Sequence, residues 1–167
     1  MSARVLLAAL AAAGCALIGR ACAMRCTRRA DLLSALPQAL LLLRIQMLDR
    51  VTPTRKALGR SACALLRELA AHMEDKDAAQ AWKEVRLQET RRGGSLDCLQ
   101  REDLAVLDDF FGGLGLSGGS EQEALFDAAI RAMTALGDEA RKGGAEKNRL
   151  YTTLGLLVGL TLAILLL

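Results

Sequence analysis

The chain has 167 residues, of which 52% are hydrophobic but only 3% aromatic, and it carries a formal net charge of +3. A length of this order suits one domain. Alanine and leucine supply most of the apolar content and there are two prolines, a composition that favours helices over sheets. The composition therefore predicts an all-α protein, and the small net charge gives no reason to expect a nucleic-acid partner.

The first apolar run, Val5 to Gly19, is uncharged and slightly short for a membrane span. It allows three interpretations: a signal peptide with a cleavage site at Ala21-Cys22-Ala23, a weak lipoprotein site at Gly14-Cys15, or a retained membrane helix within residues 1–24.

Charge favours the retained helix. Basic residues close to a span hold that flank in the cytosol. Only Arg4 and the amino terminus precede the apolar run, whereas four arginines follow it: Arg20, Arg25, Arg28 and Arg29. We therefore expect an N-terminal membrane helix followed by a cytosolic region over residues 25–146.

Residues 25–146 repeat apolar side chains at helical spacing, which predicts a small helical bundle. The first helix has a packed seam formed by Leu33, Leu36, Leu40, Leu43 and Met47. A second apolar side, made by Leu41, Ile45 and Leu48, needs a cover from the bundle or from a partner. Pro37 is expected to kink this helix or to mark its start.

Caps and glycine-rich breaks predict the remaining helices. Thr52 with Pro53 opens one helix, Asp77 with Gln80 caps the next, and Ser120 with Glu123 caps the last. The breaks fall at Gly93-Gly94 and at "GGLGLSGG". A further pair, Gly143-Gly144, is expected to loosen the join to the C-terminal segment.

The chain ends in eighteen uncharged residues, Leu150 to Leu167, which predict a second membrane helix over residues 147–167. Gly155, Gly159 and Ala163 recur every four residues and form a candidate helix-packing interface with other membrane helices. The upstream flank is basic, with Arg141, Lys142, Lys147 and Arg149. Both ends therefore predict a cell-membrane protein with a cytosolic central region and both termini outside.

The sequence offers no constellation for catalysis, for a metal or for another cofactor. His72 is the only histidine and lies near a helix end, and the adjacent Asp108 and Asp109 diverge too far on a helix to share one site. The cysteines, at 15, 22, 26, 63 and 98, include no C-x-x-C pair and would stay thiols in a reducing cytosol. We expect a non-enzymatic protein with no small-molecule substrate.

Three stretches resemble the stage III sporulation protein AB family of endospore-forming bacteria: "TPTRKAL", "DDFFGGLGLSGGSEQ" and "KNRLYTTLGLLVGLTLAILLL". The similarity runs from about Arg28 to the end, with Trp82 also in pattern. The matching positions are Phe111, Gly112, Leu114, Gly115 and Gln122 in the second stretch and Lys147, Leu150, Tyr151, Thr153, Leu154, Gly155 and Gly159 in the third. The chain departs from the family pattern at Gln46 and Asp49.

The resemblance implies a platform in the channel complex that joins the mother cell to the forespore, similar to the inner-membrane platform proteins of type II secretion. Its implied partners are a sporulation ATPase and other membrane proteins of the same complex. An alternative from a different class is a tail-anchored helical regulator or adaptor whose N-terminal segment is cleaved or peripheral.

Overall fold

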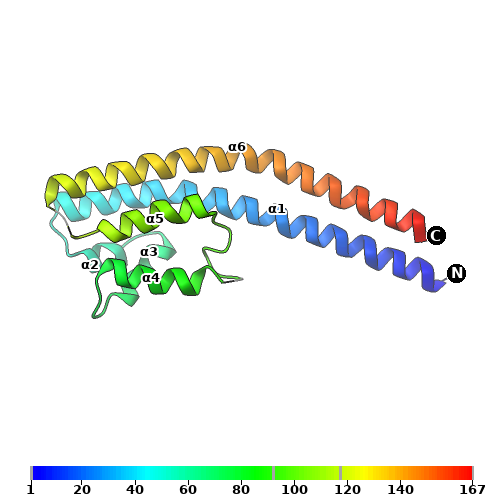
Figure 1. The fold of residues 1–167 in the computed structure, drawn as a ribbon, viewed down its shortest axis with the longest axis horizontal. Helices are drawn as coiled ribbons and strands as arrows, with labels where there is room; N and C mark the ends of the chain where they lie inside the picture. The colour runs from blue at the N-terminus through cyan, green and yellow to red at the C-terminus, as the bar shows by residue number, and fades with distance from the viewer. Residues whose placement is uncertain (1, 92, 117, 167) are drawn as a thin grey trace. The chain divides into compact units, whose positions relative to one another are not determined.

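The computed structural model describes residues 2–91, 93–116 and 118–166, all of whose regular elements are helical (Figure 1). In the outer parts of the first and last helices it describes the backbone alone, for residues 2–13, 15, 16, 145–149, 151, 152, 155, 156, 158–160 and 162–166. The α-helices are α1 (Ser2–Arg44), α2 (Thr54–Gly59), α3 (Ala64–His72), α4 (Ala78–Glu89), α5 (Arg101–Gly113) and α6 (Gly119–Leu166). A π-helix, Ile45–Asp49, follows α1. The predicted all-α class is confirmed.

The chain divides into two compact units. One, which we call the helical domain, is Asp31–Asp138. The other, which we call the arms, consists of Met1–Ala30 and Glu139–Leu167. Helices α1 and α6 contribute to both units. The sequence-based division into residues 1–24, 25–146 and 147–167 stays a prediction.

The core of the helical domain begins with the predicted seam of α1. Leu33, Leu36, Leu40 and Leu43 are buried, whereas Met47 lies half-buried in the π-helix. The second apolar side is covered only in part, since Leu41 is 47% exposed and Ile45 is 39% exposed while Leu48 is half-buried. The sequence therefore predicted the covered side correctly, and the other side is left for another contact.

Aromatic rings connect three helices of the domain. Trp82 of α4 lies 4.7 Å from Phe111 of α5, measured between ring centroids. Phe110 meets both Phe111 and Phe126 of α6 edge to face at 5.1 Å. All four rings are buried, and such pairs add about 0.5–1.5 kcal/mol each beyond their area. These few aromatic residues thus hold α4, α5 and α6 together.

Pro37 does not start a helix, because α1 runs through it. Proline has no backbone N–H, so the carbonyl oxygen of Leu33 loses its partner four residues ahead. Gly137 of α6 packs at this carbonyl: a Cβ added to Gly137 would lie 3.2 Å from the Leu33 oxygen. The glycine thus allows α6 to approach the backbone of α1 beside Pro37.

Helix starts differ from the predictions in two places. Helix α2 begins at Thr54, with Pro53 at the N-cap position, one residue later than expected. Helix α6 begins at Gly119, so Ser120 already lies in its first turn, and Glu123 pairs with Arg44. The cap of α4 is as predicted, because the Asp77 side chain accepts a 2.7 Å hydrogen bond from the backbone N–H of Gln80.

The arms run side by side and bring both termini to the same end (Figure 1). Their contact uses small residues: a Cβ on Gly144 would lie 3.9 Å from the carbonyl oxygen of Cys26, and Ala23 and Ala140 are buried. Gly143 and Gly144 lie inside the continuous helix α6 and do not interrupt it.

In the part of the chain that the structure describes, one helical stretch, Leu17–Asp49, is long and apolar enough to cross a membrane. Its second half carries the α1 seam, which is buried in the helical domain. The expected C-terminal span lies mostly outside the residues whose side chains are described.

Candidate functional site

Loops gather at the end of the helical domain where α1 ends and α6 begins. We call this region the loop end and define it as the π-helix, Arg50–Pro53 and Leu114–Leu116. A Cβ added to Gly115 would lie 3.8 Å from Thr54 Oγ1, so the loop before α6 lies against the start of α2. The segments "TPTRKAL" and "DDFFGGLGLSGGSEQ", far apart in the sequence, meet here.

Gln122 fixes the conformation of the glycine-rich loop. Its Nε2 donates to the carbonyl oxygen of Gly113 at 2.8 Å, and its Oε1 accepts from the backbone N–H of Gly115 at 3.3 Å. The side chain is only 6% exposed, so both amide groups are satisfied inside the fold. Gly115 has a φ of +83°, a conformation that favours glycine. The sequence predicted a glycine-rich break between helices here, and two hydrogen bonds hold that break in one conformation.

Val51 has an unfavourable backbone conformation at the loop end. Its φ is +48°, which costs a β-branched residue about 1–2 kcal/mol. Its side chain is 81% exposed, so packing does not compensate for the strain. The neighbouring π-helix is also a rare element that is frequent at functional sites. Such strain motivates a functional assignment.

Sequence reasoning missed Val51, because the sign of φ cannot be read from residue type. The only available signal was the Thr52-Pro53 pair that follows it, which predicts a break in the helix.

Large apolar side chains are exposed at the loop end and beside it. Val51 is 81% exposed and Leu116 is 71% exposed, both on loops. Leu41, Leu42 and Ile45, at the end of α1 and in the π-helix that follows, are also exposed. Exposed apolar side chains on loops held by a rigid scaffold are typical of protein-binding sites.

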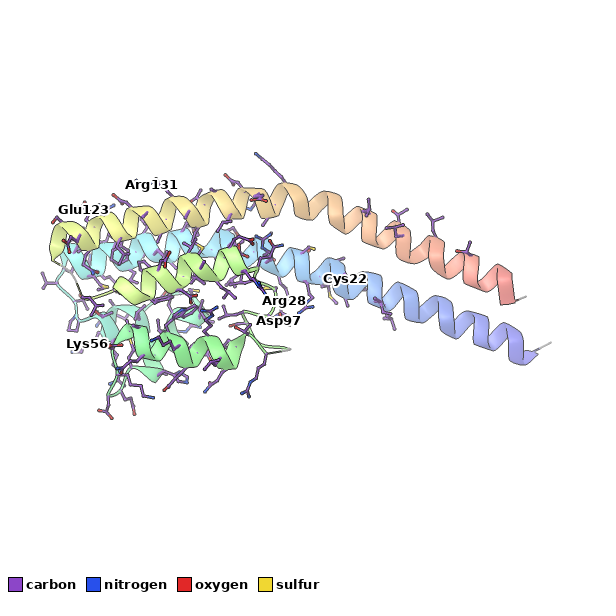
Figure 2. All side chains as sticks on the ribbon, viewed as in Figure 1. Cys22, Arg28, Lys56, Asp97, Glu123 and Arg131 are labelled. Carbon is purple, nitrogen blue, oxygen red and sulfur yellow. The ribbon has the colours of Figure 1, made fainter. Side chains whose placement is uncertain are left out.

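An ion-pair cluster ties the scaffold of the loop end together. Arg44, the last residue of α1, donates to Asp127 Oδ1 at 2.8 Å and also pairs with Glu123, which Figure 2 labels near the start of α6. The Arg44 side chain is 29% exposed, so solvent screens these pairs only in part. The cluster holds the end of α1 against the first turns of α6.

An open hollow lies along α4, with a volume of about 610 Å³. It is lined by Lys83, Arg86, Leu87, Thr90 and Arg91. Leu87 is 71% exposed, the same fraction as Leu116. The lining is mostly basic, although Asp108 pairs with Arg86 at one edge.

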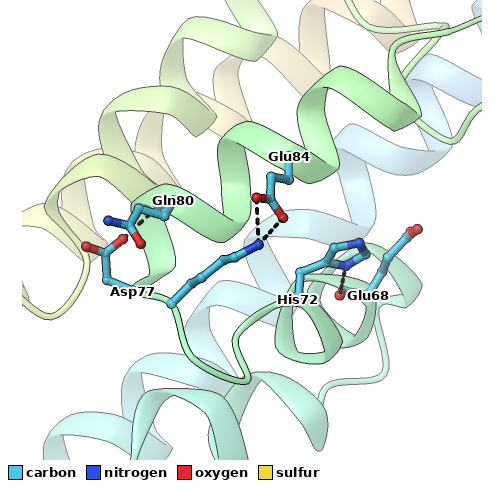
Figure 3. A network of polar contacts seen from close by, with 6 residues as sticks. Glu68, His72, Asp77, Gln80 and Glu84 are labelled. Atoms are coloured by element: carbon cyan, nitrogen blue, oxygen red, sulfur yellow. Dashed lines mark hydrogen bonds and ion pairs between the residues drawn. The ribbon is translucent and has the colours of Figure 1, made fainter.

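The candidate catalytic residues make structural contacts. His72 Nδ1 lies 3.0 Å from the carbonyl oxygen of Glu68 in the same helix (Figure 3). Asp108 accepts a 2.7 Å hydrogen bond from Trp82 Nε1, whereas Asp109 is exposed. Among the described residues, no three His, Cys, Asp or Glu side chains are grouped so that they could hold a metal ion.

The four cysteines whose side chains are described, Cys22, Cys26, Cys63 and Cys98, are not joined in disulfides. Cys15 falls outside the residues whose side chains are described.

Two glutamates on neighbouring helices, Glu68 of α3 and Glu89 of α4, influence each other's ionisation. Burial and the adjacent Glu89 carboxylate raise the pKa of Glu68. The pKa of Glu89 is lowered, chiefly because its carboxylate accepts a 2.6 Å hydrogen bond from the backbone N–H of Ser95. Glu68 therefore takes up a proton more readily than Glu89.

The predicted packing stripe, Gly155, Gly159 and Ala163, lies in the helical backbone of α6 but outside the residues whose side chains are described. Its role stays a prediction.

Comparison of the sequence with known protein families shows the family to which this chain belongs. The chain matches the family described as Stage III sporulation protein AB over residues 4–167, nearly its whole length, and belongs to that family. No curated protein and no solved structure matches it. The resemblance noted in the sequence is thereby confirmed and extends to the N-terminal arm.

Proposed function

As a member of the stage III sporulation protein AB family, this chain is, we propose, a non-enzymatic membrane platform of the complex that joins mother cell and forespore. Its helical domain would face the cytosol of the mother cell, and both arms would span the membrane. A cytosolic sporulation ATPase would bind the domain, and other membrane proteins would pack on the arms. The family match over residues 4–167 is the observation that carries this proposal.

The continuity of α1 supports an N-terminal segment that is retained. The helix runs from Ser2 to Arg44 without a break at the Ala21-Cys22-Ala23 site, and Ala23 is buried against its surroundings. A signal peptidase needs an accessible, extended site, which this helix does not present. The mass of the purified protein decides: a mature chain that starts at Met24 would favour the tail-anchored regulator instead.

The loop end is our choice for the contact with the cytosolic partner. It combines strain at Val51 with exposed apolar loop side chains, and the Arg44 and Gln122 hydrogen bonds make it rigid. A rigid apolar site loses little conformational entropy on binding.

Deletion of the gene tests the role in sporulation. Spore formation should stop after engulfment, and a plasmid copy should restore it. Leu116→Gln should fail to restore spore formation, while Leu87→Gln, at an equally exposed leucine on α4, should succeed. Normal sporulation without the gene would remove the proposed function. A defect in Leu87→Gln alone would move the partner contact to the α4 hollow.

The topology is tested with single cysteines in a cysteine-free chain. Leu116→Cys should react with a membrane-impermeant thiol reagent only after lysis, because Leu116 belongs to the cytosolic domain. Ser2→Cys should react in intact cells, because the N-terminus lies outside. Labelling of Leu116→Cys in intact cells would contradict the proposed orientation.

Packing of the C-terminal arm on other membrane helices is tested by Gly159→Leu. The bulky side chain should reduce crosslinking between this arm and its neighbours, since close approach needs small residues. Val158→Leu is the matched control, and unchanged crosslinking in Gly159→Leu would count against the stripe.

A further inference from the structure

Charge is divided unevenly between the two units of the chain. The arms contain nine basic and two acidic residues, a net charge of +7. The helical domain contains thirteen basic and seventeen acidic residues, a net charge of −4. The net charge of +3 is therefore the sum of a strongly basic unit and an acidic unit.

Within the arms the positive charge is concentrated in a short band. The described members are Arg20, Arg25, Arg28 and Arg29 on α1 and Arg141 and Lys142 on α6, and we call them the basic collar. All except Arg29 are exposed, and Arg28 is labelled on α1 in Figure 2. Arg25, Arg28 and Arg29 also make contacts within the chain. The acidic residues of the arms, Glu139 and Glu146, are too few to neutralise the band.

The pairing of the arms brings both halves of the collar together. Gly144 lies against the carbonyl oxygen of Cys26, so the residues near position 26 on α1 and near position 144 on α6 are neighbours. From Arg20 to Arg29 a helix rises about 13 Å. The headgroup layer on one side of a bilayer is about 5–8 Å thick. The collar therefore covers that layer and the water within one Debye length of it.

We infer that the basic collar binds anionic phospholipids through their headgroup phosphates. The inference rests on the proposed membrane insertion of the arms, and it adds a preference for lipid charge that insertion alone does not need. Arginine suits this role because its guanidinium donates two parallel hydrogen bonds to phosphate. Clusters of four to eight basic residues beside a span are typical of such binding.

Lipid retention by the full chain tests the inference. The purified protein is titrated in detergent with phosphatidylglycerol or phosphatidylcholine, and the lipid retained is counted by native mass spectrometry. We expect about tenfold tighter retention of the anionic lipid. A variant with Arg20, Arg25, Arg28 and Lys142 all replaced by Gln should lose this preference. A matched variant with Lys56, Arg60, Lys83 and Arg91 replaced by Gln removes equal charge from the helical domain and should keep it.

Three further measurements separate the alternatives. Alkaline extraction from phosphatidylcholine vesicles shows whether the chain is inserted in the bilayer. Extraction of the chain would refute the proposed function. An inserted chain that shows no preference for anionic lipid would refute only this inference. Millimolar glycerol phosphate should not displace the lipid; displacement would assign the collar to a soluble phosphate. Collar-dependent binding of a short oligonucleotide at physiological salt would also overturn the assignment.

Discussion

The hydrogen bond between Trp82 and Asp108 gives a measurable prediction for the helical domain. Asp108 Oδ1 accepts the indole N–H at 2.7 Å, and its other oxygen pairs with Arg86. Trp82 is only 2% exposed, so its indole N–H relies on this acceptor. Asp108→Leu should cost about 2–3 kcal/mol of unfolding free energy, mostly for a buried donor left without a partner.

Asp108→Asn separates the two contacts of this side chain. The amide oxygen can still accept the indole hydrogen bond, but the pair with Arg86 is lost. That pair is worth little, because the Arg86 and Asp108 side chains are 44% and 31% exposed and solvent screens them. We expect a loss of about 1 kcal/mol in Asp108→Asn, one third to one half of the loss in Asp108→Leu.

Urea unfolding in mild detergent, followed by tryptophan fluorescence, measures both variants. The chain has one tryptophan, so the signal reports Trp82 alone. Asp109→Leu is the control, because Asp109 is the exposed neighbour on the same helix, and it should change stability by less than about 0.5 kcal/mol. Equal losses in Asp108→Leu and Asp109→Leu, or in Asp108→Leu and Asp108→Asn, would refute the reasoning.

Four other substitutions test three separate features by the same urea assay. Gly112→Ala should stabilise the domain by about 0.5–1 kcal/mol, since a Cβ there meets nothing within 4 Å. Gly137→Ala should not stabilise it, because its Cβ would lie too close to the Leu33 carbonyl oxygen. Equal stabilisation by the two substitutions would refute the close approach of α6 to α1. Val51→Asn should stabilise by about 1 kcal/mol, because asparagine tolerates a positive φ, and a loss would refute the strain. Glu68 has a raised pKa, so its contribution to stability is fully present below its ordinary pKa of 4.5 and is lost as the pH rises through the folded-state value. Glu68→Gln should therefore stabilise more at pH 7 than at pH 4, and a pH-independent difference would contradict this sign.

Local patterns in the sequence predicted the parts of the fold that depend on neighbouring residues. The leucine seam of α1, the buried face around Trp82 and the Asp77 cap each follow from helical spacing or from the chemistry of one side chain. Of the two roles predicted for Pro37, the helix start is wrong, because α1 continues through this residue, and the kink stays a prediction.

The loop end was beyond prediction for a different reason. Its geometry depends on contacts between distant segments, such as Gly115 with Thr54 and Gln122 with Gly113. Helical periodicity carries no information about which loops meet. Gln122 matched the family pattern, but the pattern alone did not indicate that its amide would bridge the loop.

The Gln122 bridge makes the loop and the first turn of α6 cooperative. Gln122 lies in that turn, so its hydrogen bonds to Gly113 and Gly115 exist only while the turn is helical. A protein that binds the loop at Leu116 would therefore reduce fraying of the first turn of α6. By reciprocity, fraying of that turn would lower the affinity for the protein. The rate of amide hydrogen exchange at residues 120–123 should therefore report whether a protein is bound to the neighbouring loop.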